Sequence, residues 1–181
     1  MATYICILRG INVSGSKPIK MDALRTAFEA LGFSAVHTYI QSGNIIFQHK
    51  TTKTAELEKR VHKKILDSFG FDVPVLVKTI AELEQIISAN PFVQQENNDI
   101  ASIYVTFLAS VPAKEHIAQL EACQFPNEAF VYTAGAVYLY VPRGYGNAKL
   151  SNNLIEGKLK VRATTRNWKT TLELLNLARK S

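Results

Sequence analysis

The order of strand and helix patterns along the chain is the feature that most restricts what this sequence can fold into. In the first half, short apolar runs indicate strands, and apolar residues at three- and four-residue intervals indicate helices. The patterns are, in chain order, a strand at 4–8, a helix at 21–31, strands at 36–40 and 45–47, a helix at 57–69 and a strand at 73–77. This order, βαββαβ, is that of the split βαβ or ferredoxin-like arrangement, in which two helices cover one face of a four-stranded sheet.

The same order begins again in the second half of the chain. The patterns there are a strand at 103–108, a helix at 114–123, a hairpin formed by 130–132 and 137–141, and a helix at 150–159. A helix bearing Trp168, Leu172 and Leu175 follows, and no final strand is expected before it. We therefore predict an α+β fold, with a βαββαβ first half and a related βαββα second half that ends in a C-terminal helix. The expected division is 1–79 for the first half, 80–99 for a connecting helix and seam, and 100–181 for the second half with basic C-terminal helices.

Length and composition place the chain among globular proteins with a buried core. It has 181 residues, of which 47% are hydrophobic, and no apolar stretch approaches the roughly 20 residues that span a bilayer. The two cysteines, Cys6 and Cys123, and the four histidines show no metal-ligand spacing. We therefore expect a cytoplasmic protein with reduced thiols, no metal and no cofactor.

Positive charge is concentrated towards the C-terminal end of the sequence. Residues 143–181 contain nine lysines and arginines against two glutamates, a net charge of +7, whereas the first 142 residues carry −1. A basic segment beside a nearly neutral body is typical of proteins that bind phosphates or another acidic partner. A solvated basic surface without a ligand is the alternative.

Two groups of polar residues follow the first and second predicted strands. The first group is Arg9, Gly10 and Asn12, and the second is Gln41, Ser42 and Asn44. In a split βαβ unit these two strands run in the same direction, so both groups emerge at one edge of the sheet. Arginine and amide donors suit a phosphate or a carboxylate, which makes the two groups a candidate anion site. The alternative is that turns select glycine and asparagine for their backbone geometry.

Two segments near the C-terminal end contribute further candidates. In the run Thr164-Thr165-Arg166-Asn167-Trp168, we expect a threonine to cap a helix whose free N–H groups attract anions, with Arg166 and Asn167 beside them. An arginine at a helix N-terminus opposes the helix dipole, and such a local conflict is typical of functional sites. The loop 143–149 is basic and rich in glycine, and its last residue, Lys149, is another candidate anion contact.

Two familiar nucleotide-binding and RNA-binding patterns do not fit. Gly10 and Gly15 have the spacing of a Walker A loop. In a Walker A loop a lysine directly follows the second glycine, but here Ser16 stands between Gly15 and Lys17. Pro18 then follows in place of the serine or threonine that opens the helix. The RNA-recognition module shares the element order, but 44–47 lacks the glycine and aromatic alternation of its third strand. Neither class is therefore predicted.

Four segments resemble, in order and spacing, the motifs of a bacterial family catalogued as domain of unknown function 1697. They are Leu8-Arg9-Gly10-Ile11-Asn12-Val13, Tyr39-Ile40-Gln41-Ser42-Gly43-Asn44, Lys149-Leu150-Ser151-Asn152 and Thr164-Thr165-Arg166-Asn167-Trp168. The resemblance spans nearly the whole chain and implies a bacterial, cytoplasmic α+β protein. The positions that it marks as part of the family pattern are Arg9, Asn12, Gln41, Ser42, Asn44, Lys149, Arg166 and Asn167. It implies no activity and no substrate.

Three functions follow from the residues and stay open at this point. The leading hypothesis is a module that binds a phosphate-bearing ligand, RNA or a nucleotide, with Arg9, Lys149 and Arg166 as anion contacts. The second is a small enzyme acting on a phosphorylated or carboxylated metabolite. The polar motifs contain no histidine or carboxylate for acid–base chemistry, and Glu156 is the nearest candidate. The third is a structural or interaction protein whose polar motifs only cap and turn the chain.

Overall fold

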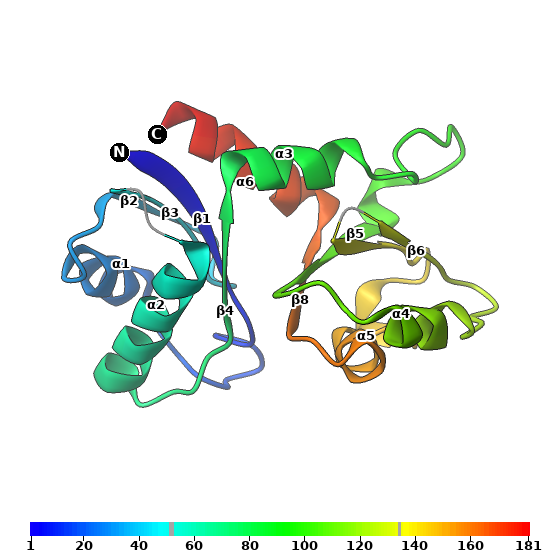
Figure 1. Cartoon of the computed structure of the whole chain (residues 1–181), viewed down its shortest axis with the longest axis horizontal. Coiled ribbons are helices and arrows are strands. Elements are labelled where there is room, and N and C mark those ends of the chain that lie inside the picture. The colour runs from blue at the N-terminus through cyan, green and yellow to red at the C-terminus, as the bar shows by residue number, and fades with distance from the viewer. Residues whose placement is uncertain (51–52, 134) are drawn as a thin grey trace. The chain divides into compact units, whose positions relative to one another are not determined.

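The computed structural model describes residues 1–50, 53–133 and 135–181. It contains two compact units, one formed by residues 1–83 with 173–181 and the other by residues 84–172 (Figure 1). Each unit has its own four-stranded antiparallel sheet with helices. The predicted α+β fold in two related parts is therefore confirmed, while the seam expected at 80–99 stays a prediction.

The first unit has the βαββαβ order that its sequence pattern predicts. Its elements are β1 (Ala2–Leu8), α1 (Met21–Glu29), β2 (Ser34–Tyr39), β3 (Asn44–His49), α2 (Thr54–Phe69) and β4 (Val75–Thr79). The strand order is β2-β3-β1-β4, and every neighbouring pair is antiparallel. Since β1 and β2 both run against β3, they run in the same direction, and their C-terminal ends lie at the same edge of the sheet.

The core of the first unit lies between one face of this sheet and the helices α1 and α2 (Figure 1). Alternate residues of β1 point into it, as the two-residue period of a strand requires. The buried side chains include Tyr4, Cys6 and Leu8 of β1, Leu24 and Phe28 of α1, and Leu57, Val61 and Ile65 of α2. In both helices the apolar residues recur every three or four positions, so that they form one stripe facing the sheet.

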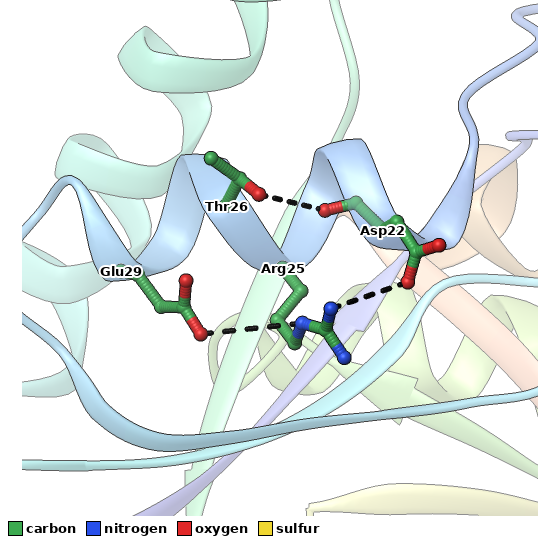
Figure 2. A network of polar contacts seen from close by, with 4 residues as sticks. All are labelled: Asp22, Arg25, Thr26 and Glu29. Carbon is green, nitrogen blue, oxygen red and sulfur yellow. Dashed lines mark hydrogen bonds and ion pairs between the residues drawn. The ribbon is translucent and has the colours of Figure 1, made fainter.

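The polar side of α1 carries a small network of side chains, drawn in Figure 2. Nη2 of Arg25 is 3.3 Å from Oδ1 of Asp22, and Nε of Arg25 is 4.0 Å from Oε1 of Glu29. The hydroxyl of Thr26 donates to the backbone carbonyl of Asp22 at 3.0 Å. Exposed ion pairs of this kind contribute about 0.5 kcal/mol or less each. The helix therefore depends on its buried apolar stripe for stability.

The second unit repeats the arrangement with the strand order β6-β7-β5-β8. After α3 (Ile80–Ser88) and a 3₁₀ turn, its elements are β5 (Ile103–Leu108), α4 (Lys114–Glu121), β6 (Ala129–Thr133), β7 (Ala136–Tyr140), α5 (Asn152–Leu159) and β8 (Ala163–Asn167), and α6 (Trp168–Lys180) follows. Its core packs Leu108, Val137 and Leu139 of the sheet against Leu120 of α4 and against Ile155 and Leu159 of α5.

The expectation that the second half lacks its final strand is wrong. Residues 163–167 form β8, which pairs antiparallel with β5, so that Thr165 lies opposite Thr106. Pattern reasoning missed this strand because Ala163 is its only apolar residue, so no alternation of apolar and polar side chains is visible. Threonine is nevertheless a good strand former, since its branched side chain fits a pleated surface.

Tyr138 connects the second sheet to α3. Its side chain is fully buried, and its hydroxyl donates to the backbone carbonyl of Ile86 at 2.6 Å. Burial disfavours the phenolate and raises the pKa of Tyr138 from 10.0 to about 12. The protonated phenol is therefore the form that the folded protein holds.

We expect the free energy of unfolding to fall above pH 10 because of Tyr138. The native state keeps the phenol proton up to its pKa of about 12, whereas the unfolded state loses it near 10.0. Stability from this group is therefore complete below pH 10 and declines by about 1.4 kcal/mol per pH unit between the two values. Urea unfolding at several pH values would measure the decline.

The matched variant is Tyr138→Phe, which keeps the ring and removes the titrating group. We expect it to cost about 1 kcal/mol at neutral pH, since one hydrogen bond is lost. Between pH 10 and 12 its stability should fall less steeply than that of the unchanged protein. Parallel pH profiles for the two proteins would show that Tyr138 does not titrate in this way.

Candidate functional site

The loop after β1 and the hairpin after β2 meet at one edge of the first sheet. The backbone N–H of Leu8 donates to the carbonyl of Gly43 at 2.8 Å. The side-chain amide of Asn12 donates to the carbonyl of Gln41 at 2.9 Å. The meeting of these segments, which are about thirty residues apart in sequence, follows from the parallel directions of β1 and β2. This part of the predicted convergence is confirmed.

Asn12 closes its own loop as well as contacting the hairpin. Its Oδ1 accepts from the backbone N–H of Ile19 at 2.8 Å, and its Nδ2 donates to the carbonyl of Ile19 at 2.9 Å. With the bond to Gln41, both amide hydrogens of Asn12 are used by backbone carbonyls. Asn12 therefore acts as a clamp between two loops.

Asn44 plays the same part inside the hairpin. It is fully buried, and its Nδ2 donates to the carbonyl of Tyr39 at 3.1 Å and to the hydroxyl of Ser42 at 2.9 Å. By contrast with the buried Asn44, Gly10 and Gln41 are exposed and Arg9 is half-buried. The side-chain amide of Asn44 thus stabilises the conformation of the hairpin.

Gly43 cannot be replaced by a larger residue without moving its neighbours. Its φ is +86°, in the left-handed region, and a Cβ built on it would lie 2.8 Å from Cδ1 of Ile11 and 2.8 Å from Cβ of Leu8. Ile40, in the same hairpin, has a φ of 50°, which is rare for a β-branched residue. The close approach of the two loops therefore needs a glycine at this position.

We expect Gly43→Ala to lower the free energy of unfolding by about 3 kcal/mol. About 1 kcal/mol would come from the left-handed φ, and the rest from overpacking against Ile11 and Leu8. The control is Gly32→Ala, because Gly32 has a φ of +80° but no atom within 4 Å of an added Cβ. The control should lose only about 1 kcal/mol. Equal losses in urea unfolding would contradict the role of the close contact.

The segment 149–152 in the second unit is built around a chain of hydrogen bonds. Ser151 caps α5, since its hydroxyl accepts from the N–H of Leu154 at 3.2 Å. Nδ2 of Asn152 donates to the carbonyl of Ala163 at 3.0 Å, and its Oδ1 accepts from the hydroxyl of Thr165 at 2.9 Å. Asn152 thus joins α5 to β8.

The expectation that a threonine caps the last helix is also wrong. Asn167 ends β8, and its Oδ1 accepts from the N–H of Thr170 at 2.8 Å, so Asn167 is the residue that caps α6. The threonines at 164 and 165 lie within the strand. Arg166 lies there too, before the helix begins, and its Nη1 donates to the carbonyl of Thr165 at 3.1 Å. Arg166 therefore lies in the strand, one residue before the cap, and not in the first turn of the helix.

A pocket of about 260 Å³ lies beside the loop 143–149 in the second unit. Its walls combine two cations, two amides, one carboxylate, an aromatic ring and a proline. The lining residues are Arg143, Lys149, Asn127, Asn147, Glu128, Phe125 and Pro126. Arg143 and Lys149 both have exposed side chains, and Phe125 is half-buried. The pocket therefore has a charged part and an apolar part.

Glu128 fixes one wall of this pocket. Its Oε1 accepts from the backbone N–H of Lys149 at 2.9 Å, and its Oε2 accepts from the N–H of Leu150 at 2.8 Å. These bonds tie the start of the α5 segment to the chain before β6. Sequence reasoning missed Glu128, since its partners lie 21 and 22 residues away and no local pattern marks such a bond.

The structure divides the predicted site residues into three groups. Arg9, Gly10, Asn12, Gln41, Ser42 and Asn44 lie in the two loops of the first unit. Lys149 lines the pocket of the second unit, where it is joined by Arg143. Arg166 and Asn167 lie at the junction of β8 and α6 and are not among the residues that line this pocket.

The described part of the chain contains neither a cluster of metal ligands nor a membrane-spanning helix. Among the residues that the structure describes, no group of three or more histidines, cysteines, aspartates and glutamates could hold a metal ion. Within 1–50, 53–133 and 135–181, no helix is both long enough and apolar enough to cross a membrane.

Comparison with known families identifies one family that the chain matches over most of its length. The chain belongs to the family described as "Protein of unknown function (DUF1697)", whose model matches residues 1–138. The match contains the two loops of the first unit and ends before Lys149, so the resemblance of the later segments lies outside it.

A solved structure shows the same fold over almost the whole chain. It is that of the conserved bacterial protein SP0830 from Streptococcus pneumoniae, which is 22% identical. The TM-score is 0.78, and the similarity covers 98% of each chain. None of the curated proteins matches the sequence.

Proposed function

We propose that this protein is a binding module for a phosphate-bearing ligand and that the ligand occupies the pocket beside the loop 143–149. The observation that carries the proposal is the presence of Arg143, Lys149 and two asparagine amides in the wall of one pocket. Guanidinium and ammonium groups form strong, charge-assisted hydrogen bonds with phosphate oxygens, and amides add neutral donors. These are the groups that a phosphate site requires.

The charge distribution of the second unit supports the same proposal. Residues 143–172 contain seven lysines and arginines against one glutamate, whereas residues 84–142 contain one lysine against six aspartates and glutamates. Charge of one sign gathered in one segment attracts ligands of the opposite sign more effectively than the same charge dispersed. The pocket residues Arg143 and Lys149 belong to the basic segment.

The acid–base groups in the lining of the pocket favour binding over catalysis, and Glu128 is the residue to consider. Of the seven described residues that line the pocket, it is the only carboxylate. Both of its oxygens accept backbone hydrogen bonds, which hold the carboxylate in a structural position. The described lining holds no histidine and no second carboxylate that could work with Glu128 in acid–base catalysis.

In the loops of the first unit, the two asparagines mainly hold the chain itself together. The amide hydrogens of Asn12 and Asn44 are used within the chain, which favours a structural role for both. Arg9 and Arg166 stay predicted anion contacts.

Inorganic phosphate is the simplest probe of the pocket. We expect Arg143→Gln and Lys149→Gln each to weaken phosphate binding about tenfold, or about 1.4 kcal/mol, since each removes one charge-assisted contact. The matched control is Lys158→Gln, which removes the same charge from an exposed position on α5. Calorimetric titration of the four proteins would measure the effect.

Two outcomes would contradict the proposal. One is the absence of phosphate binding to the unchanged protein at low salt. The other is an equal weakening by Lys149→Gln and Lys158→Gln, which would indicate a general charge effect. For an RNA ligand, binding should also fall steeply with salt, because each neutralised phosphate releases counterions.

A further inference from the structure

We infer that the ligand of this pocket is a single 5′-phosphorylated ribonucleotide, with its ribose hydroxyls on Glu128 and its base beside Phe125. The inference rests on the proposed phosphate function of Arg143 and Lys149 and adds a chemical class to it. It starts from the two wall residues that a site for phosphate alone would not need.

Glu128 is the first of these residues. A carboxylate in the wall repels an anion, so a bare phosphate gains nothing from it. Each of its oxygens accepts one backbone hydrogen bond, and an ionised carboxylate has about four acceptor positions. About two positions therefore remain for donors on the ligand. The neighbouring hydroxyls of a ribose supply two such donors, and carboxylates recognise ribose hydroxyls in this way in other folds.

Phe125 is the second. Its ring stands edge-on to that of Phe130, with 6.0 Å between the centroids and 75° between the planes. This contact holds the ring in place at the pocket wall, next to Pro126. Every nucleobase has a flat π-face that can stack on an aromatic side chain, whatever its identity. The apolar part of the pocket thus suits a base.

The volume limits the size of the ligand. Pockets for small molecules usually measure about 300 to 1,000 Å³, and this one, at about 260 Å³, is slightly below that range. It is therefore suited to one nucleotide and too small for several. A free mononucleotide and the 5′-phosphorylated end of an RNA share this chemistry.

Calorimetric titration of the full chain with a graded set of compounds tests the inference. The probes are inorganic phosphate, ribose 5-phosphate, AMP, 2′-deoxy-AMP, 3′-deoxy-AMP and a 5′-phosphorylated RNA trinucleotide. We expect affinity to rise from phosphate through ribose 5-phosphate to AMP. Loss of either hydroxyl should weaken AMP binding about tenfold, since Glu128 then loses a donor.

Phe125→Leu separates the base contact from the phosphate contact. Leucine keeps the apolar packing against Phe130 but cannot stack on a base. We expect this variant to bind AMP about tenfold more weakly and ribose 5-phosphate as well as the unchanged protein does. An equal loss for both compounds would show a damaged pocket and would overturn the role of the ring.

The outcomes distinguish this inference from the proposed function. If phosphate binds but AMP binds no more tightly, or if the deoxy compounds match AMP, the ribonucleotide is overturned and the phosphate site stands. If no compound binds, both are overturned. Tighter binding of the trinucleotide than of AMP would support the inference with an RNA end as the source, and the reverse would support it with a free nucleotide.

Discussion

Both units depend on two neighbouring strands that are each paired along both edges. In the first unit β3 lies between β2 and β1, and β1 lies between β3 and β4; in the second unit β7 lies between β6 and β5, and β5 lies between β7 and β8. These central strands are largely apolar, because their two faces are both covered. Antiparallel pairing on each side fixes the direction of every other strand. The loops that leave β1 and β2 meet at one edge for this reason alone.

The asparagines of the segments that resemble family motifs mostly make hydrogen bonds within the chain itself. Asn12, Asn44 and Asn152 donate their amide hydrogens to carbonyls and hydroxyls of neighbouring segments. A buried amide left without a partner would cost about 1 to 3 kcal/mol, so such bonds are part of what holds the loops in one conformation. The exposed cationic side chains of Arg143 and Lys149 lie around the loop 143–149.

Much of the fold could be predicted from the sequence, since helices and long apolar strands leave a clear period. The meeting of Asn12 with Gln41 could be predicted too, because β1 and β2 run in the same direction and the loops that follow them leave the sheet at the same edge. β8 could not, since its threonines carry no apolar alternation. Glu128 was also beyond reach, because its bonds to Lys149 and Leu150 join distant segments and nothing nearby in the sequence marks them.

The outermost strands bear on how the protein behaves at high concentration. A sheet edge with unpaired backbone groups can recruit a strand from another molecule and start aggregation. β8 is five residues long and carries Arg166, which makes a poor partner for such pairing. β2, at the end of the other sheet, has a register shift between Ser34 and His37 and a left-handed φ of 48° at Ala35. A shortened, charged edge and a kinked edge are both protections against intermolecular strand addition, and one of them lies at an outer edge of each sheet.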